Sequence, residues 1–347
     1  MRKTHGIRQR QTARTAALAV LLVTVLCLAA APANAAVVYN ANVNTMITNV
    51  TQAQLQPVVN ELSGETPAFI FGSPYTVLTR GSSSGVPIDM AEQYIYEHLL
   101  SYGLDSVSFQ DYPGKGGGVK PGRNIIGQIN GTTKPNEIIV IGCHIDDQKW
   151  GDPLAPGADD DASGTSAVLY LARSFADKNF ARTIRFCFFG SEENASWGSN
   201  MFGAGYYANQ CKLAGQNIVG MVEADALAYN AGSVPRNGRV VALHRRMKSN
   251  AGEVALYTMW KDVFAAYSIT GLDPQDWAYS MKYSDHGAFW NYMSSTPAVL
   301  LIEEDGVYVT NPNWHTPNDK VSTFNWPYYV AVTQSLVGLA AHQAQIQ

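Results

Sequence analysis

Residues Glu137 to Phe175 read EIIVIGCHIDDQKWGDPLAPGADDDASGTSAVLYLARSF, an apolar run, an acidic loop and a helical pattern in succession. The run Glu137 to Cys143 is short and rich in β-branched residues, which predicts a buried strand. From Asp161 the apolar residues are spaced as on one face of a helix, and the segment opens with helix-capping residue types. Because another apolar run follows at Thr183 to Phe189, the stretch predicts a βαβ unit.

Strands and helices continue to alternate on both sides of this unit. The segment 130–136, NGTTKPN, predicts a hairpin or another tight connection between two strands. The strands from residue 137 on are almost continuously apolar, as expected when helices cover both faces of a sheet. We therefore expect one α/β domain over residues 36–347, with a central, mostly parallel mixed β-sheet covered by helices on both faces. Further strands are predicted at Asn124–Ile129, Ile218–Val222 and Ala298–Ile302, and helices at Gln52–Leu62, Ile88–Tyr102, Ser199–Ala208, Val254–Tyr267 and Trp326–His342.

The amino terminus has the pattern of a secretory signal peptide. Five basic residues and no acidic residue accompany an apolar run from Ala16 to Ala31, and Ala33-Asn34-Ala35 matches a small-x-small cleavage site. A membrane anchor is the rival interpretation, but the run is shorter than the ~20 residues of a spanning helix. We predict that residues 1–35 are a signal peptide and that the mature protein is secreted, extracellular or periplasmic, and free of the membrane.

The predicted mature chain is acidic and poor in cysteine. Without residues 1–35 it has 19 basic and 28 acidic residues, a net charge of −9, which argues against nucleic acid as a partner. Three cysteines remain, an odd number that excludes a dense disulfide framework. Cys143 and Cys187 lie within apolar runs and are predicted to be buried core residues.

The loop 144–161 holds one histidine and six carboxylates. Asp159, Asp160 and Asp161 are adjacent, and their charges repel one another unless a cation neutralises them. One aspartate suffices to cap the following helix, and Asp161 or Ser163 can take that place. The remaining charge favours metal binding over capping alone, and one carboxylate can bridge two metal ions.

Later apolar segments also end in candidate ligands. In α/β sheets the site lies beyond the carboxyl ends of the strands, so these residues are expected at one edge. Asp146 would share a face with His144 and support its ring. Gly190 is expected to permit the turn that brings two neighbouring glutamates to the site. The candidates are His144, Glu192, Glu193, Asp225 and His315.

The motifs CHIDD, PGADDDASG, FFGSEEN, MVEADA, YSDHGAFW and NPNWHTPND, in this order, resemble those of the secreted co-catalytic zinc aminopeptidases of peptidase family M28. The resemblance spans nearly all of the mature chain and implies a zinc-peptidase, phosphorylase/hydrolase-like fold. It also implies two zinc ions (Zn2+) per chain. Position by position, His144 and Asp225 would bind one ion, Glu193 and His315 the other, and Asp160 would bridge them, with Glu192 as general base and Asp146 behind the first histidine.

The resemblance further implies what the site would do. Water held between two zinc ions, with Glu192 as general base, would hydrolyse the first bond of peptides that have a free N-terminus. A cis peptide bond is expected between Asp160 and Asp161. Some relatives have a tyrosine where this chain has Trp314, so we assign no oxyanion residue. We expect a monomer.

We expect apolar first residues in the substrate. Five aromatic and methionine residues either line an apolar pocket or are ordinary core residues: Met281, Tyr283, Phe289, Trp290 and Trp314.

Other functions remain as alternatives. A glutaminyl cyclase has the same fold and uses one zinc ion, and a secreted metal-binding protein would show no catalysis. Gly81 to Gly85 matches the G-x-S-x-G pattern of serine hydrolases, although Val86-Pro87 separates it from the following helix. For His286 we favour a structural role or one behind the ligands.

Overall fold

The computed structural model describes residues 36–114, 121–148, 154–193, 201–230, 239–247, 250–278, 282–303 and 311–347. The predicted signal peptide and Met281 lie outside these ranges. In the ranges given, no helix combines the length and the apolar character needed to cross a membrane.

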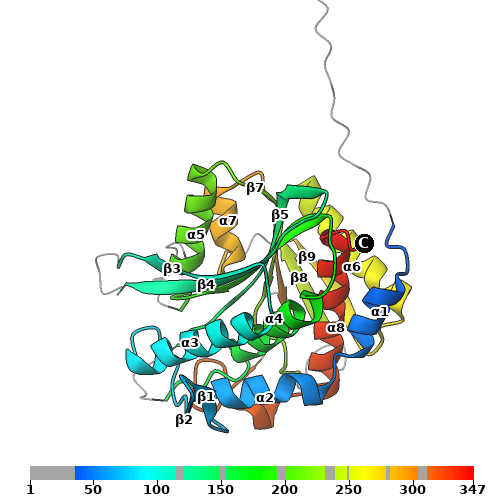
Figure 1. Ribbon diagram of the computed structural model, residues 1–347. Coiled ribbons are helices and arrows are strands. Elements are labelled where there is room, and N and C mark those ends of the chain that lie inside the picture. The colour runs from blue at the N-terminus through cyan, green and yellow to red at the C-terminus, as the bar shows by residue number, and fades with distance from the viewer. Residues whose placement is uncertain are drawn as a thin grey trace, which may run out of the picture. The chain divides into compact units, whose positions relative to one another are not determined.

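A mixed β-sheet occupies the centre of the fold (Figure 1). Its four central strands are parallel to one another, and the strand on either side of these four is antiparallel to them. This arrangement confirms the predicted mostly parallel, mixed sheet. In spatial order the strands are β3 (Ser106–Tyr112), β4 (Gly122–Ile129), β6 (Arg182–Phe189), β5 (Lys134–His144), β7 (Asn217–Ala224), β10 (Ala298–Ile302), β8 (Val240–Arg245) and β9 (Asp273–Ala278).

Helices cover both faces of the sheet, which explains the unbroken apolar runs. Along β5, Ile139 and Ile141 face the larger core, whereas Ile138 and Val140 face a second core on the other side. Figure 1 shows α5 (Phe202–Leu213) and α7 (His286–Tyr292) together on the second side. The larger core is covered by α1 (Ala41–Thr48), α2 (Gln52–Leu62), α3 (Val86–Ser101), α4 (Ala162–Phe175), α6 (Ala251–Tyr267) and α8 (Trp326–Gln343).

The predicted βαβ unit is confirmed as β5, α4 and β6, and of the two alternatives predicted for residues 130–136 the structure shows the tight connection, not the hairpin. Strand β6 lies between β4 and β5, so these two successive strands do not pair. The connection crosses the start of β6, where a Cβ atom on Gly131 would lie 2.5 Å from the carbonyl oxygen of Ala181. A tight connection therefore exists without the pairing that a hairpin requires.

Several elements were not predicted from the sequence. They include α1, α7, β3, β8, β9 and a separate small hairpin of β1 (Ala68–Ile70) with β2 (Ser73–Tyr75). Helix α5 begins at Phe202, and the predicted start at Ser199 lies outside the described residues. The cysteines Cys143 and Cys187 are buried, as predicted.

Candidate metal centre

The predicted site residues meet at the carboxyl edge of the parallel strands. His144 ends β5, the two glutamates follow β6, and Asp225 follows β7. Because β6, β5 and β7 are neighbours and parallel, their ends bring these side chains together. Asp160 comes from the loop before α4, and His315 from the segment between β10 and α8.

Two histidines face each other across the carboxylate of Asp160. The Nε2 atom of His144 lies 3.1 Å from Oδ1 of Asp160 and 3.4 Å from Oδ1 of Asp225. The Nε2 atom of His315 lies 3.1 Å from Oδ2 of Asp160 and 2.9 Å from Oε1 of Glu193. Each histidine nitrogen is therefore close to two carboxylate oxygens, and Asp160 belongs to both groups.

These distances fit pairs of ligands on one metal ion. Tetrahedral zinc with bonds of about 2.0–2.2 Å places two of its ligand atoms roughly 3.3 Å apart. A single imidazole N–H serves two acceptors poorly, and Oδ2 of Asp160 has no hydrogen bond of acceptable geometry although His315 is adjacent. His144, Asp160 and Glu193 each offer one potential ligand atom, and these three atoms lie within 4.8 Å of one another. Imidazole and carboxylate groups are ligands that suit zinc.

The electrostatics of the cluster call for positive charge. Burial alone lowers the pKa of His144, but the carboxylates of Asp225 and Asp160 hold that pKa well above its usual range. Burial also raises the pKa of Glu193, to which the neighbouring Asp160 adds. In contrast, the two histidines outweigh burial and lower the pKa of Asp160. Either protons or metal ions can supply the positive charge that these carboxylates need.

The second ring nitrogen of His144 shows which atom is available to a metal. Its Nδ1 lies 2.9 Å from the main-chain carbonyl oxygen of Asp146, and a carbonyl only accepts, so Nδ1 donates. This leaves Nε2 to face Asp160 and Asp225. The sequence led us to expect the carboxylate of Asp146 as the partner of His144, and the structure assigns that contact to its main-chain oxygen instead.

The carboxylate of Asp146 holds the two glutamates. Oδ1 accepts the main-chain N–H of Glu192 at 3.0 Å, and Oδ2 accepts that of Glu193 at 3.2 Å. The hydroxyl of Ser82 also donates to Oδ2. Asp146 is fully buried, so these bonds determine where the turn after β6 can lie.

The turn that carries the glutamates depends on Ser191. This residue has φ of 59°, in the left-handed region that only glycine enters readily. Gly190, which was expected to make the turn, has another role, since a Cβ atom there would lie 2.6 Å from the Tyr112 hydroxyl oxygen. Ala226 and His315 also have positive φ. Backbone strain of this kind is often found at functional sites.

Two other expectations about the acidic loop are confirmed. Asp161 caps α4, because its side chain accepts the main-chain N–H of Gly164 at 2.8 Å. The peptide bond between Asp160 and Asp161 is cis. Asp161 also accepts the main-chain N–H of His144 at 3.2 Å, so it joins the end of β5 to the start of α4.

Of the five residues predicted to line an apolar pocket or to belong to the core, two are core residues. Phe289 and Trp290 are buried in the second core. Tyr283 is 62% exposed, and the ring of Trp314 stacks on that of His315 with centroids 3.4 Å apart. His286 is buried at the start of α7, with its ring edge-on to Trp290.

The G-x-S-x-G segment lacks the setting of a nucleophile. Residues 76–80 form no strand, whereas a nucleophile elbow connects a strand directly to a helix. Ser82 instead donates to Asp146.

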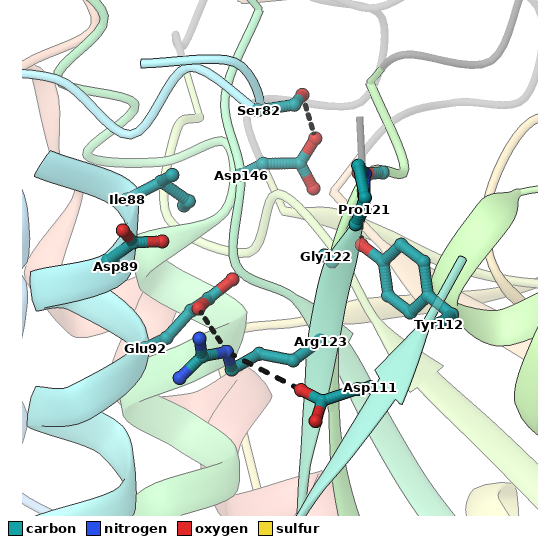
Figure 2. Close-up of a pocket in the computed structure, with 12 residues that line it drawn as sticks. Ser82, Ile88, Asp89, Glu92, Asp111, Tyr112, Pro121, Gly122, Arg123 and Asp146 are labelled. Atoms are coloured by element: carbon teal, nitrogen blue, oxygen red, sulfur yellow. Dashed lines mark hydrogen bonds and ion pairs between the residues drawn. The ribbon is translucent and has the colours of Figure 1, made fainter. Parts of the chain in front are cut away.

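A cavity of about 160 Å³ lies beside Asp146, on the side of α3 and β4. Figure 2 shows Ser82 and Asp146 along one part of this cavity and Glu92 with Arg123 along another. The Glu92 side chain is 6% exposed, and its Oε2 lies 3.2 Å from Nε of Arg123. Burial raises the pKa of Glu92 to about 8, although Arg123 opposes that shift.

Sequence reasoning missed two buried residues next to the acidic loop. Arg80 lies in a turn-rich segment and is 1% exposed. Asp319 is the last residue of the NPNWHTPND motif and is also 1% exposed. No spacing rule identifies Arg80, because its contacts are to main-chain atoms, whereas the position of Asp319 four residues after His315 was an available signal.

A covered mixed sheet with histidines and carboxylates at the ends of its parallel strands places the molecule among α/β proteins of the metal-dependent hydrolase class. The sequence model of peptidase family M28 matches residues 124–340, more than half of the chain. The chain therefore belongs to peptidase family M28.

Curated relatives agree with this family. A probable zinc metalloprotease of Leptosphaeria maculans is 29% identical over 201 residues, covering 52% of this chain and 45% of the relative. Leucine aminopeptidase 1 of Aspergillus fumigatus is 28% identical over 229 residues, covering 62% of this chain and 54% of the relative. The chain thus spans about half the length of these two relatives.

Solved structures share the fold. LapB from Legionella pneumophila superposes with a TM-score of 0.69 at 21% identity, covering 88% of this chain and 75% of LapB. Glutaminyl cyclase from Macrostomum lignano superposes with a TM-score of 0.70 at 17% identity, covering 91% of this chain and 96% of the cyclase. At these identities the likeness concerns the fold alone.

Proposed function

We propose that this protein is a secreted zinc aminopeptidase that uses two zinc ions to hydrolyse the first peptide bond of its substrates. The observation that carries the proposal is the Asp160 carboxylate, whose two oxygens each lie 3.1 Å from Nε2 of a different histidine. The names of two relatives, a zinc metalloprotease and a leucine aminopeptidase, support the metal and the reaction.

The ligand groups divide as the distances suggest. His144 and Asp225 would hold one ion, Glu193 and His315 the other, and Asp160 would contribute to both. When bound, the two ions would polarise the scissile carbonyl and lower the pKa of a water molecule from about 16 towards 7.

Glu192 is assigned the general-base role. It is buried, its main-chain N–H is held by Asp146, and the adjacent Glu193 rather than Glu192 contacts His315. Its carboxylate would accept a proton from the attacking water and deliver it to the amine that leaves when the C–N bond breaks.

The acidic surroundings suit a substrate with a cationic amino terminus. Carboxylates that exceed the local positive charge would attract the α-ammonium group and so confine cleavage to the first bond. A preference for apolar first residues is supported by the leucine aminopeptidase relative. Of the described aromatic candidates, Tyr283 and Trp314 lie outside the buried cores, and Trp314 stacks on the proposed ligand His315.

A chelator experiment tests the proposal. The purified mature chain should contain two zinc ions, lose activity with a chelator and regain it with zinc, as read on aminoacyl anilides of Leu, Phe, Lys and Glu. Leu and Phe substrates should be cleaved fastest. Absence of hydrolysis on every anilide with zinc restored would favour a non-catalytic metal-binding protein instead.

A glutaminyl cyclase is the second candidate, because a solved cyclase shares the fold over 91% of this chain. The cyclase reaction joins the substrate amine to its own side chain and requires one zinc ion. One zinc per chain, together with cyclisation of an N-terminal glutamine, would replace the aminopeptidase proposal.

A further inference from the structure

Arg80 contacts the acidic loop through main-chain carbonyl groups. Within the described part of the chain, the hydrogen bonds of its guanidinium all go to main-chain oxygens. One is that of Ile145, next to His144, at 2.8 Å, and another is that of Gly157 at 2.7 Å. The main chain of Arg80 adds two more contacts, since its N–H donates to Ala155 at 3.0 Å and its oxygen accepts from Asp147 at 3.1 Å. The remaining carbonyl partners are Leu62, Pro156 and Asp160.

Asp319 contacts the same loop through main-chain N–H groups. Its two carboxylate oxygens each lie 3.1 Å from the nitrogen of Asp159, and Oδ2 accepts the N–H of Asp160 at 3.0 Å. Its main-chain oxygen accepts the N–H of Ala158 at 3.1 Å. Three consecutive N–H groups of the loop are therefore held by one residue. Asp319 in turn donates its own N–H to Thr316, next to His315.

We propose that Arg80 and Asp319 are positioning residues that hold residues 156–160 from two sides, so that the Asp160 carboxylate already lies between His144 and His315 before a metal binds. The proposal rests on the proposed function in that Asp160 serves as the shared ligand. Buried N–H and C=O groups need partners, and here a guanidinium supplies them for the carbonyls while a carboxyl group supplies them for the N–H groups. A ligand fixed in advance loses less freedom on binding.

Besides the loop 156–160, Arg80 and Asp319 each contact a different segment of the site. Arg80 joins the loop to Ile145 and so fixes Asp160 relative to His144. Asp319 joins the loop to the segment of His315. We therefore expect Arg80→Lys to weaken chiefly the ion held by His144 and Asp225, and Asp319→Asn to weaken chiefly the ion held by Glu193 and His315.

Zinc affinities of the variants test this expectation. Arg80→Lys and Asp319→Asn are compared with the wild type, and with Arg173→Lys and Asp177→Asn, which change exposed residues on and just after α4. Competition with a chromophoric chelator should show a 10- to 100-fold loss of affinity at one ion in each test variant, the range seen when groups behind metal ligands are changed. The control variants should stay within threefold of the wild type.

Apoprotein melting separates positioning from general damage. A merely structural role would lower the melting temperature and weaken both ions equally, whereas positioning predicts unequal losses that differ between the two variants. Equal losses, or affinities within threefold of the wild type in folded variants, would overturn the proposal.

Amide hydrogen exchange in the wild-type apoprotein provides a test that needs no variant to fold. The N–H groups of Ala158, Asp159 and Asp160 should be protected without zinc, and free exchange at all three would refute advance positioning. Failure of the proposed function would give a different result from failure of this inference. In that case the wild type would bind no pair of zinc ions or cleave no anilide, while the protection of these three amides could still be measured.

Discussion

Two acidic neighbourhoods meet at Asp146, and they differ in what balances their charge. On the cavity side, Glu92 is paired with Arg123, whose guanidinium also lies 3.8 Å from Asp111 (Figure 2). On the other side, the carboxylates face two imidazole rings.

The difference indicates on which side of Asp146 a metal ion would bind. An arginine is permanently charged, and burial raises the pKa of Glu92 to about 8, so near neutral pH the cavity side carries little unbalanced negative charge. Imidazole is neutral at ordinary pH unless acids raise its pKa, as they do for His144. The histidine side therefore needs added positive charge, and the cavity side does not. Substitutions on the two sides should have correspondingly different effects.

The largest effect is expected from Asp160→Ala. This change removes an oxygen from both ligand groups, and a lost Lewis acid costs several kcal/mol of transition-state stabilisation. We expect kcat/KM on a leucine anilide to fall by about 1,000-fold or more, with zinc content below two per chain. Asp111→Ala, on the cavity side, is the matched control and should keep both zinc and activity. Equal losses in the two variants would remove the contrast between the neighbourhoods.

Glu192→Gln should separate catalysis from metal binding. The substitution keeps the size of the side chain but removes its ability to accept a proton. We expect kcat to fall by roughly 100-fold or more, with two zinc ions still bound. Glu92→Gln, the same change across Asp146, should leave kcat unchanged. Near-normal turnover of Glu192→Gln would show that this glutamate is not the base.

Ser82→Ala should have a small effect, because Asp146 keeps its two main-chain donors. Loss of one hydrogen bond costs about 0.5–1.5 kcal/mol, which corresponds to a roughly 2- to 10-fold fall in kcat. Ser101→Ala, near the far end of α3, is the control. Inactivation comparable to that of Glu192→Gln would instead indicate that the hydroxyl takes part in the chemistry.

Several helices and strands with a clear pattern of apolar residues were predicted correctly from the sequence. Helix α2 and strand β10 have the predicted bounds, and the candidate ligands come together at the sheet edge as expected. Their metal binding remains a prediction. Strand β9 was missed because its sequence, DPQDWA, contains no apolar run, whereas the buried run at the start of β8, VVALHR, was an available signal.

Contacts to main-chain atoms were harder to predict. Arg80 bonds to carbonyl oxygens and Asp319 to N–H groups, which every residue of the loop possesses. The contact between His144 and Asp146 was misassigned for the same reason, because it involves a main-chain oxygen. Whether His144 meets the carboxylate or the carbonyl oxygen of Asp146 depends on the backbone path after β5. Residue spacing identifies which segments meet but not which atoms.

Glu92→Gln should change stability with pH while leaving activity intact. The folded protein keeps a proton on Glu92 up to about pH 8, whereas the unfolded chain releases it near pH 4.5. Between these values the folded state binds more protons, so this group lowers the free energy of unfolding as pH rises, by as much as about 5 kcal/mol in all. Glutamine has no proton to lose, so the stability of the variant relative to the wild type should increase from pH 4.5 to 8 in urea unfolding. A difference that stays constant over that range would mean that Glu92 is ionised in the folded protein and that Arg123 alone balances its charge.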